Sequence, residues 1–213
     1  MGEQKQKISK AVRLKYNILA RIYDLIYRNY IKTTIQSAVA SLNLVGQERL
    51  LDIGCGTGEL EKALLKKMPS LNIVGIDISD DMLEKARNKL SQYPNVHLIT
   101  GDFLNTEIPG NEYDVAFSLS NLHYFSNPIA VFKKVSLLLK SGGQFVIIDW
   151  DRNSFKGRLY NWYMNKADPS FTKTYSMSEA IEMLQANGFK TVQSDGFKVR
   201  FVWVMMRLVS KKA

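Results

Sequence analysis

The chain has 213 residues, of which 46% are hydrophobic, and a formal net charge of +9. This length and composition predict one globular domain with a sizeable core over residues 1–213. A single cysteine, Cys55, excludes an internal disulfide and a multi-cysteine metal site, and no metal is expected. The first residues show no signal-peptide core and no apolar run is long enough to cross a bilayer, so a cytoplasmic location is expected.

The positive charge is concentrated in the two flanks of the sequence. Residues 1–36 carry eight Lys and Arg against two Asp and Glu, and residues 152–213 carry eleven against four. Residues 37–151 carry ten against fourteen, so the middle of the chain is mildly acidic. The basic flanks are either solvated faces or contact surfaces for something anionic, such as an acidic small molecule, a membrane surface or RNA.

Two helices are the first elements expected along the chain. Residues 9–28 show an amphipathic helical pattern that includes Tyr16 and Tyr23. A second helix is expected over residues 30–42. The two helices form a predicted cap over residues 1–45.

A glycine turn follows a predicted buried strand over residues 49–53. Gly54, Gly56 and Gly58 occupy alternate positions, and a helix opens at Glu59. Glycine lets a backbone approach a ligand closely, and the N–H groups at the start of a helix are free donors. The G-x-G-x-G spacing differs from the dinucleotide fingerprint, and the Lys and Ser/Thr of a P-loop are absent. Acidic residues after the turn favour a ligand with a cationic group; a tight turn without any ligand is the alternative.

Acidic residues also follow the next two predicted strands. The strand over residues 72–77 ends in Asp77, 19 residues beyond the last glycine of the turn. A strand–helix–strand unit places an acceptor for two ribose hydroxyls at this position. The strand over residues 96–100 leads into Asp102 and Phe103, which puts a second acid beside an aromatic ring.

The remaining elements continue an alternation of strands and helices. They are a helix from Ser79 to Leu90, strands over residues 114–118 and 143–150, a helix over 178–187, and strands over 189–195 and 199–209 on either side of Gly196. This order predicts an α/β fold with a doubly wound, mostly parallel, seven-stranded sheet and helices on both faces. Residues 150–176 leave the sheet at the edge where such folds bind ligands. This insertion is therefore expected to cover the active site, with a surface hairpin as the alternative.

These motifs together resemble the class I S-adenosylmethionine-dependent methyltransferases. The match is Asp52-x-Gly54-x-Gly56-x-Gly58, then Ile76-Asp77-Ile78-Ser79, then Gly101-Asp102-Phe103. The resemblance implies a Rossmann-like fold with a cofactor-binding core over residues 46–149. It also implies that the last strand is antiparallel, within a C-terminal helix and hairpin over residues 177–213.

The resemblance assigns each motif to one part of the cofactor, S-adenosyl-L-methionine, whose product is S-adenosyl-L-homocysteine. The glycine turn with Asp52 would hold the methionine part, and Asp77 would bind both ribose hydroxyls. Asp102 would bind the adenine amino group, between Ile78 and Phe103 on the two faces of the base. The residue types agree with this cofactor, because it carries a sulfonium cation and no phosphate.

The N-terminal segment resembles a second family feature. Tyr16-Asn17-x-x-Ala20-Arg21-x-Tyr23-Asp24 is similar to segments that precede the core in small-molecule methyltransferases of the ubiquinone/menaquinone-biosynthesis-like branch. There the helix closes over the cofactor. The resemblance places Tyr23, and with it Tyr16, near the methionine end; simple packing of the helix is the alternative.

Methyl transfer requires an aligned acceptor, exclusion of water and sometimes removal of a proton. The residues that face the methyl group are expected at the tip of the fourth strand, residues 118–125, with Ser118 holding the cofactor's amino group. His123 is either the proton acceptor, because imidazole titrates near neutral pH, or a wall of the pocket. Other residues expected in the substrate pocket are Asn121, Trp150 and Tyr160.

The sequence thus predicts a methyltransferase that acts on the oxygen or carbon of a small molecule, with an anionic or aromatic acceptor. The (Asn/Asp)-Pro-Pro-Tyr motif of enzymes that methylate the amino groups of adenine or glutamine is absent. An RNA-modifying methyltransferase is one alternative, because the basic flanks could contact phosphates, although no RNA-binding module is visible. A regulator that binds the cofactor without catalysis is the other. The acceptor and the oligomeric state stay open.

Overall fold

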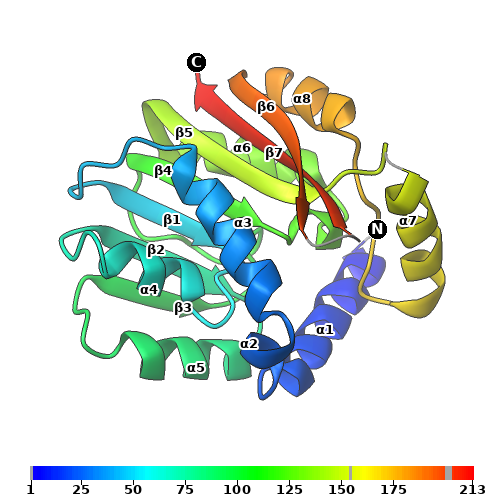
Figure 1. Cartoon of the computed structure of the whole chain (residues 1–213), viewed down its shortest axis with the longest axis horizontal. Helices are drawn as coiled ribbons and strands as arrows, with labels where there is room; N and C mark the ends of the chain where they lie inside the picture. Colours follow the sequence, from blue (N-terminus) through cyan, green and yellow to red (C-terminus); the bar gives the residue numbers. More distant parts are fainter. Residues whose placement is uncertain (1, 154, 200–202) are drawn as a thin grey trace.

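A seven-stranded sheet runs through the part of the chain that the structure, a computed structural model, describes: residues 2–153, 155–199 and 203–213. Its strands are β1 (Arg49–Ile53), β2 (Asn72–Asp77), β3 (Val96–Thr100), β4 (Tyr113–Leu119), β5 (Leu139–Trp150), β6 (Phe189–Val199) and β7 (Trp203–Lys212). They lie in the order β3-β2-β1-β4-β5-β7-β6 (Figure 1). The first five strands pair in parallel, and β7 pairs antiparallel with both β5 and β6. The predicted fold, including the antiparallel last strand, is confirmed.

Helices cover both faces of this sheet. They are α1 (Gly2–Leu19), α2 (Tyr23–Ile26), α3 (Arg28–Ala40), α4 (Glu59–Leu65), α5 (Asp80–Leu90), α6 (Pro128–Leu138), α7 (Phe155–Ala167) and α8 (Met177–Gln185), with a 3-10 turn, η1, at Leu122–Tyr124. One buried cluster packs α3, α4 and α5 against the sheet, and the other packs α6 and α8 against its opposite face. No described helix is both long and apolar enough to cross a membrane.

Helix α5 shows how local sequence and packing agree. Its N-cap is Ser79, as predicted, and the Ser79 side chain accepts a hydrogen bond from the Met82 N–H at 3.2 Å. Met82, Leu83, Ala86 and Leu90 recur at helical spacing and are all buried. Because Ser79 follows the last residue of β2, Asp77, by two positions, α5 begins directly after the end of that strand.

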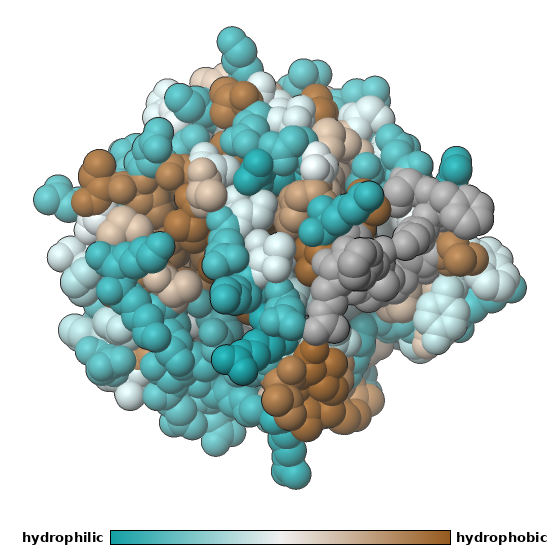
Figure 2. All heavy atoms as spheres, viewed as in Figure 1, coloured by the Kyte–Doolittle hydropathy of each residue, from teal (hydrophilic) through white to brown (hydrophobic). Residues whose placement is uncertain are grey.

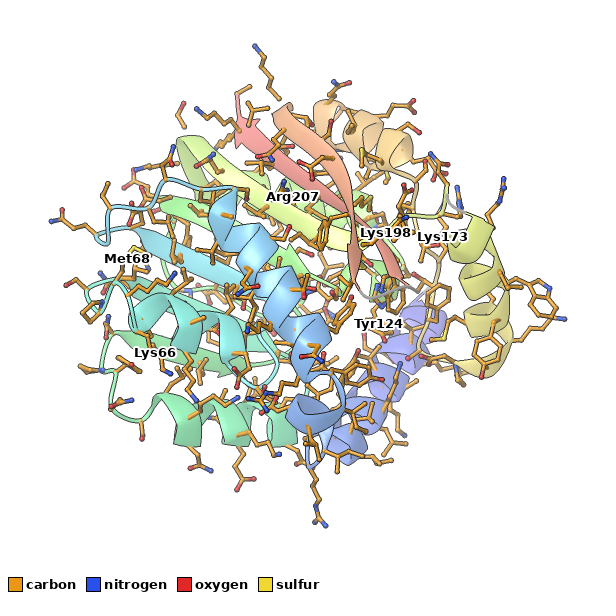
Figure 3. The ribbon with its side chains drawn as sticks, viewed as in Figure 1. Lys66, Met68, Tyr124, Lys173, Lys198 and Arg207 are labelled. Atoms are coloured by element: carbon orange, nitrogen blue, oxygen red, sulfur yellow. The ribbon has the colours of Figure 1, made fainter. Side chains whose placement is uncertain are left out.

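The sheet edge at β6 and β7 is tied to α3 by one arginine. Arg207 of β7 donates to both carboxylate oxygens of Asp195 in β6, and to the Ser37 carbonyl of α3 at 3.0 Å (Figure 3). This Arg207–Asp195 pair is bidentate, a geometry that fixes orientation as well as distance.

Two details of the predicted elements are wrong. The helix expected over residues 9–28 ends at Leu19 and resumes at Tyr23, because tertiary contacts of the following segment override its helical pattern. The turn is not at Gly196 as expected, since Gly196 pairs with Met206 inside the β6–β7 ladder. The start of the strand expected over 199–209 falls on residues 200–202, which lie outside the described residues.

Candidate active site

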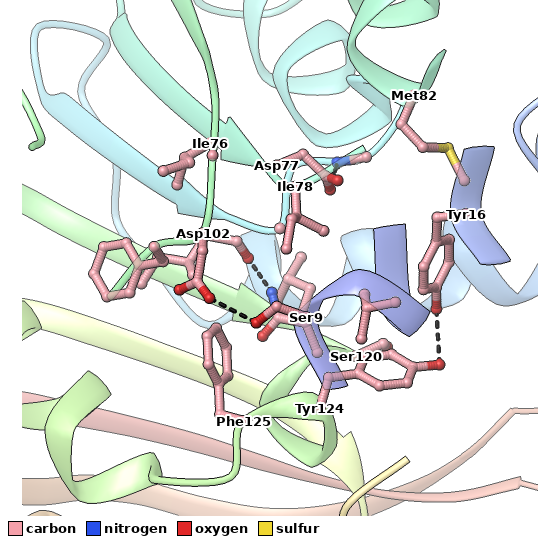
Figure 4. A pocket seen from close by; sticks show the side chains of 18 of the residues that line it. Ser9, Tyr16, Ile76, Asp77, Ile78, Met82, Asp102, Ser120, Tyr124 and Phe125 are labelled. Atoms are coloured by element: carbon pink, nitrogen blue, oxygen red, sulfur yellow. Dashed lines mark hydrogen bonds between the residues drawn. The ribbon is translucent and has the colours of Figure 1, made fainter. Parts of the chain in front are cut away.

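A cavity opens beyond the carboxyl ends of β1, β2 and β4, where a doubly wound sheet binds ligands. We call it the glycine-turn cavity. It is lined by Ser9, Val12, Tyr16, Tyr23, Ile53, Gly54, Gly56, Ile76, Asp77, Ile78, Met82, Gly101, Asp102, Phe103, Leu119, Ser120, Asn121, Tyr124 and Phe125. Figure 4 shows that its side chains come from α1, from two acidic strand ends and from the segment after β4. Sequence positions far apart thus converge on one cavity.

The glycine turn after β1 forms the floor of this cavity. Gly54 and Gly56 both have positive φ, +74° and +54°. A Cβ on Gly54 would collide with the amide of Asn121, so close packing requires glycine there. A Cβ on Gly56 would meet no atom within 4 Å, so it would project into open space. The absence of this atom leaves a cradle in which a ligand can approach the backbone.

Asp77, at the end of β2, is held by the backbone. One carboxylate oxygen accepts from the Gly56 N–H at 2.9 Å and the other from the Ser79 N–H at 2.8 Å. Burial raises the pKa of Asp77, while these N–H donors act to lower it. Each oxygen keeps a second lone pair, so the carboxylate can still accept hydrogen bonds from a ligand.

Asp102 and Phe103 stand on the loop after β3. Asp102 accepts from the Leu104 N–H at 2.9 Å and from the Ser9 hydroxyl of α1 at 2.7 Å. Phe103 is buried and lines the cavity, as does Ile78. Lys134 of α6 braces this loop, because its ammonium donates to the carbonyls of Phe103 and Thr106, both at 2.6 Å. The sequence reasoning missed Lys134 and Ser9.

Asp52 lies behind the turn. It faces a smaller adjoining pocket, which also includes Gly54, Gly56 and Tyr23. Asp52 Oδ1 and both carboxyl oxygens of Glu61 are buried and have no hydrogen-bond partner among the described residues. Burial raises the pKa of Glu61 to about 7, and it raises the pKa of Asp52 well above its ordinary value, with the Glu61 charge adding to the shift. This pair of carboxyls therefore favours a shared proton or a cationic neighbour.

The segment after β4 separates two cavities. Ser118 is buried and donates to the Asn121 side chain, which in turn donates to the Ile53 carbonyl. Asn121 lines the glycine-turn cavity, whereas Ser118 does not line it and holds the Asn121 side chain in place through this hydrogen bond. Ser120 has an uncommon φ of +61° for a non-glycine residue and hydrogen-bonds the Tyr30 hydroxyl at 2.7 Å. Such backbone conformations cluster at functional sites.

The second cavity lies between α1, α7 and the end of β5. We call it the tyrosine cavity. Its lining residues are Ala11, Leu14, Lys15, Tyr16, Ile18, Leu19, Tyr23, Tyr27, Tyr30, Ser120, His123, Tyr124, Trp150, Tyr163, Met164, Ala167, Asp168, Pro169 and Ser170. Tyr16, Tyr23, Ser120 and Tyr124 line both cavities, so the two adjoin one another.

The wall between the cavities is a hydrogen-bonded group of side chains. The Tyr16 hydroxyl donates to the Tyr124 hydroxyl at 3.0 Å (Figure 4), and Lys15 donates to the same oxygen at 2.8 Å. Lys15 also pairs with Asp168 at the end of α7. Burial raises the pKa of Tyr16 well above its ordinary value, so this hydroxyl stays protonated. These contacts join α1 to α7 above the sheet.

His123 occupies the inner end of the tyrosine cavity with only 1% of its surface exposed. Its Nδ1 lies 2.8 Å from Asp149 Oδ1, and its ring stacks on Trp150 with 4.3 Å between centroids. The neighbouring carboxylate fits a tautomer with the proton on Nδ1, which leaves Nε2 as an acceptor. Nε2 has no hydrogen-bond partner among the described residues. The sequence reasoning missed Asp149, although it follows an apolar run in β5 as Asp77 does in β2.

The insertion over residues 150–176 contributes α7 to this cavity through Tyr163, Met164 and Ala167. Trp150 lines the tyrosine cavity, and its role in a substrate pocket stays a prediction. Tyr160 belongs to α7, and its side chain lies outside the described part of the structure.

The glycine-turn cavity suits the cofactor that its motifs imply. The described lining holds two carboxylates, Asp77 and Asp102, and no Lys, Arg or His. A phosphate ligand would meet no cationic side chain there, whereas a sulfonium cation with ribose and amino groups meets acceptors. The open space above Gly56 leaves room for this ligand beside the backbone.

Comparisons with known proteins agree with the site. A family model described as "Methyltransferase domain" matches residues 50–143. The chain is 27% identical over 207 residues to a demethylmenaquinone methyltransferase of Staphylococcus saprophyticus, covering 93% of this chain and 86% of the relative. Two solved structures share the fold. One is the methyltransferase bound to the Haloferax volcanii Trm112 methyltransferase activator (17% identity, TM-score 0.81, 94% of this chain and 97% of the other). The second is a SAM-dependent methyltransferase of Thermotoga maritima (21% identity, TM-score 0.75, 97% and 100%).

The family match spans the glycine turn and both acidic strand ends that line the cavity. The fold, these motifs and the relatives therefore lead to one assignment: the protein is an S-adenosylmethionine-dependent methyltransferase, similar in its motifs to the class I family, with S-adenosylmethionine as its cofactor.

Proposed function

We propose that this methyltransferase acts on an oxygen or carbon atom of a small molecule bound in the tyrosine cavity. The observation that carries the proposal is the shared wall of the two cavities, formed by Tyr16, Tyr23, Ser120 and Tyr124. An acceptor in the tyrosine cavity would adjoin a cofactor in the glycine-turn cavity, so the reacting atoms can be held close together.

The lining of the tyrosine cavity favours an acceptor with a flat, largely apolar body. Tyr27, Tyr30, Trp150 and Tyr163 contribute aromatic side chains to this lining, and Leu14 and Ile18 add aliphatic ones. The relatives named demethylmenaquinone methyltransferases support a quinone-type or phenolic acceptor for this chain. The basic flanks of the sequence favoured an anionic acceptor. Lys15, which lines the tyrosine cavity, is already paired with Asp168, so its charge is not free to bind such an acceptor.

The proposed cofactor contacts follow the geometry of the glycine-turn cavity. Asp77 binds the ribose hydroxyls, Asp102 binds the adenine amino group, and Ile78 and Phe103 flank the base. Gly54, Gly56 and Gly58, with Asp52 behind them, surround the methionine part, and Tyr23 covers it. Ser118 acts through Asn121, which it hydrogen-bonds.

When bound, the cofactor supplies a methyl group that its sulfonium activates toward displacement. The acceptor loses one proton for each methyl group that it gains. His123 Nε2, buried and unpartnered among the described residues, is placed to take this proton. Asp149 holds the tautomer that leaves Nε2 free and stabilises the imidazolium that forms. Tyr16 and Tyr124, with α1 above them, exclude water from the junction of the cavities.

An acceptor panel tests the proposal. Purified protein is incubated with methyl-labelled S-adenosylmethionine and, separately, with hydroquinones, naphthols, aromatic carboxylates and total RNA. We expect labelled methyl groups on a phenolic or quinol compound and S-adenosylhomocysteine in equal amount. Methylation of RNA with no small molecule labelled would overturn the proposal. Cofactor binding without turnover on any class would favour a regulator instead.

A further inference from the structure

Exposed apolar side chains gather around the outer opening of the tyrosine cavity. Among the described residues, nine of thirteen exposed large hydrophobic side chains belong to α1, α2, the turn around them and α7. They are Leu14, Ile18, Ile22, Leu25, Ile26, Tyr27, Leu159, Trp162 and Tyr163, which we call the apolar rim. Figure 2 shows apolar side chains gathered at the lower edge of the molecule, where Figure 1 places the end of α1 and α2.

The apolar rim is continuous with the cavity itself. Leu14 and Ile18 are 62% and 70% exposed, yet both line the tyrosine cavity, as does the 58% exposed Tyr163. Single exposed apolar residues are ordinary on protein surfaces. A contiguous group at the mouth of a cavity instead marks a binding surface for a partner or a membrane.

Basic side chains accompany the rim. On α1, Lys7 and Lys10 are exposed and share a helical face with Leu14 and Ile18, while Ser9, Val12 and Tyr16 face the glycine-turn cavity. Helix α7 contains no Asp or Glu, and its Lys166 lies 4.4 Å from the centroid of the Trp162 ring. Basic residues beside exposed aliphatic and aromatic ones are typical of segments that lie on anionic lipid.

We propose that the apolar rim docks this enzyme on an anionic membrane surface and opens the tyrosine cavity toward the lipid. Leu25, Ile26, Leu159 and Trp162 would enter the interface, with Lys7, Lys10 and Lys166 near the headgroups. An apolar acceptor could then pass from the bilayer into the cavity without crossing water. The delivery of the acceptor rests on the proposed function; the docking itself does not.

The composition of the rim favours lipid over two other occupants. Nucleic acid is held by basic side chains on its phosphates and by aromatic rings on its bases, whereas six of the nine rim side chains are aliphatic and serve neither contact. A second copy of the chain would bring two strongly basic N-terminal segments together, since residues 1–36 carry eight basic against two acidic side chains. An anionic bilayer satisfies both the apolar and the basic side chains.

Flotation of the full chain with vesicles tests the docking without acceptor or turnover. Vesicles of equal parts phosphatidylcholine and phosphatidylglycerol are compared with pure phosphatidylcholine at two salt concentrations. We expect binding to the anionic vesicles that weakens with salt, and a loss of about fivefold for each basic residue removed in Lys7→Gln and Lys10→Gln. Binding that ignores lipid charge would overturn the proposal.

A matched pair of leucines separates the rim from the rest of the surface. Leu25 in the rim and Leu137 on α6 are 79% and 78% exposed. The double variant Leu25→Ser/Trp162→Ser should bind vesicles about tenfold or more weakly than the wild type. Leu137→Ser should bind vesicles as well as the wild type does. Stabilisation by S-adenosylhomocysteine shows that each variant is folded. Equal binding by the Leu25 and Leu137 variants would overturn the proposal, and so would a dimer of the wild type that Leu25→Ser dissolves. Failure here would leave turnover on water-soluble acceptors, and hence the proposed function, intact.

Discussion

The hydroxyl of Ser9 donates to Asp102 Oδ2 at 2.7 Å, so the N-terminal helix contacts the carboxylate that we assign to adenine. This hydrogen bond uses one lone pair of Oδ2, and a second lone pair is left for the adenine amino group. Ser9 and the amino group would therefore share one carboxylate oxygen, so helix α1 reaches directly into the proposed adenine site.

Paired variants test this relationship. Ser9→Ala removes a donor that would share Asp102 Oδ2 with the adenine amino group, so S-adenosylhomocysteine should bind equally well or up to about fivefold more tightly. Asp102→Ala removes the acceptor itself and should weaken binding at least about tenfold. Calorimetry measures both. If Ser9→Ala weakened binding as much as Asp102→Ala, Ser9 would be a cofactor ligand and not a competitor.

The His123–Asp149 pair gives a second prediction. His123→Asn keeps a donor toward Asp149 and removes Nε2, so turnover on the acceptor found in the panel should fall about 10²-fold or more. Asp149→Asn should also slow turnover, because it no longer holds the tautomer. The affinity for S-adenosylhomocysteine should change little in either variant, since neither residue lines the glycine-turn cavity.

The chain offers its own control for this test, because its second histidine, His97, is exposed on β3. His97→Gln should retain full turnover. Full turnover in His123→Asn would instead make His123 a wall of the tyrosine cavity, the alternative reading of this residue.

The buried carboxyls predict a pH-dependent stability. Burial raises the pKa of Glu61 from its ordinary value to about 7, so in this range the folded state holds a proton that the unfolded state has lost. Stability should therefore fall as pH rises from about 4.5 toward 7, by up to about 3 kcal/mol, and stay lower above that range. Asp52 acts in the same direction.

Glu61→Gln removes this titration and should become more stable relative to the wild type as pH rises. Urea unfolding of the cofactor-free protein at pH 5 and pH 8 measures the difference. Glu84→Gln, on the exposed face of α5, is the control and should show no such dependence. A constant difference between Glu61→Gln and the wild type at both pH values would contradict a raised pKa.

The sequence was most informative where function follows from local order along the chain. The glycine turn, Asp77 and Asp102 each stand directly after an apolar strand, and parallel strands bring such ends to one edge. Their convergence was therefore predictable. Contacts set by packing were not. Ser9 meets Asp102 across 93 positions, and the Asp149 partner of His123 is 26 positions away. The spacing of residues in the sequence predicts neither pair, because each contact depends on how separate elements pack against the sheet.

The break between α1 and α2 is also caused by packing contacts between separate elements. The helical pattern continues through residues 20–22, but the Asp24 side chain accepts from the Thr57 hydroxyl at 2.6 Å and from Lys89 at 3.0 Å. These contacts with α5 and the glycine turn fix the position of α2 independently of α1. Propensity in a short segment is a weak preference that such contacts override.

A pair of glycines gives the last prediction, because Gly56 and Gly142 share a backbone conformation but differ in location. Their φ values are +54° and +72°, and a Cβ at either would meet no atom within 4 Å. Alanine at either position should therefore destabilise the fold by a similar amount, about 1–2 kcal/mol. Only the methyl group of Gly56→Ala would project into the glycine-turn cavity, so only this variant should lose cofactor affinity, at least about tenfold. Calorimetry with S-adenosylhomocysteine, alongside urea unfolding, separates the two effects. Wild-type affinity in a destabilised Gly56→Ala protein would mean that this glycine serves the turn alone and that the ligand lies elsewhere in the cavity.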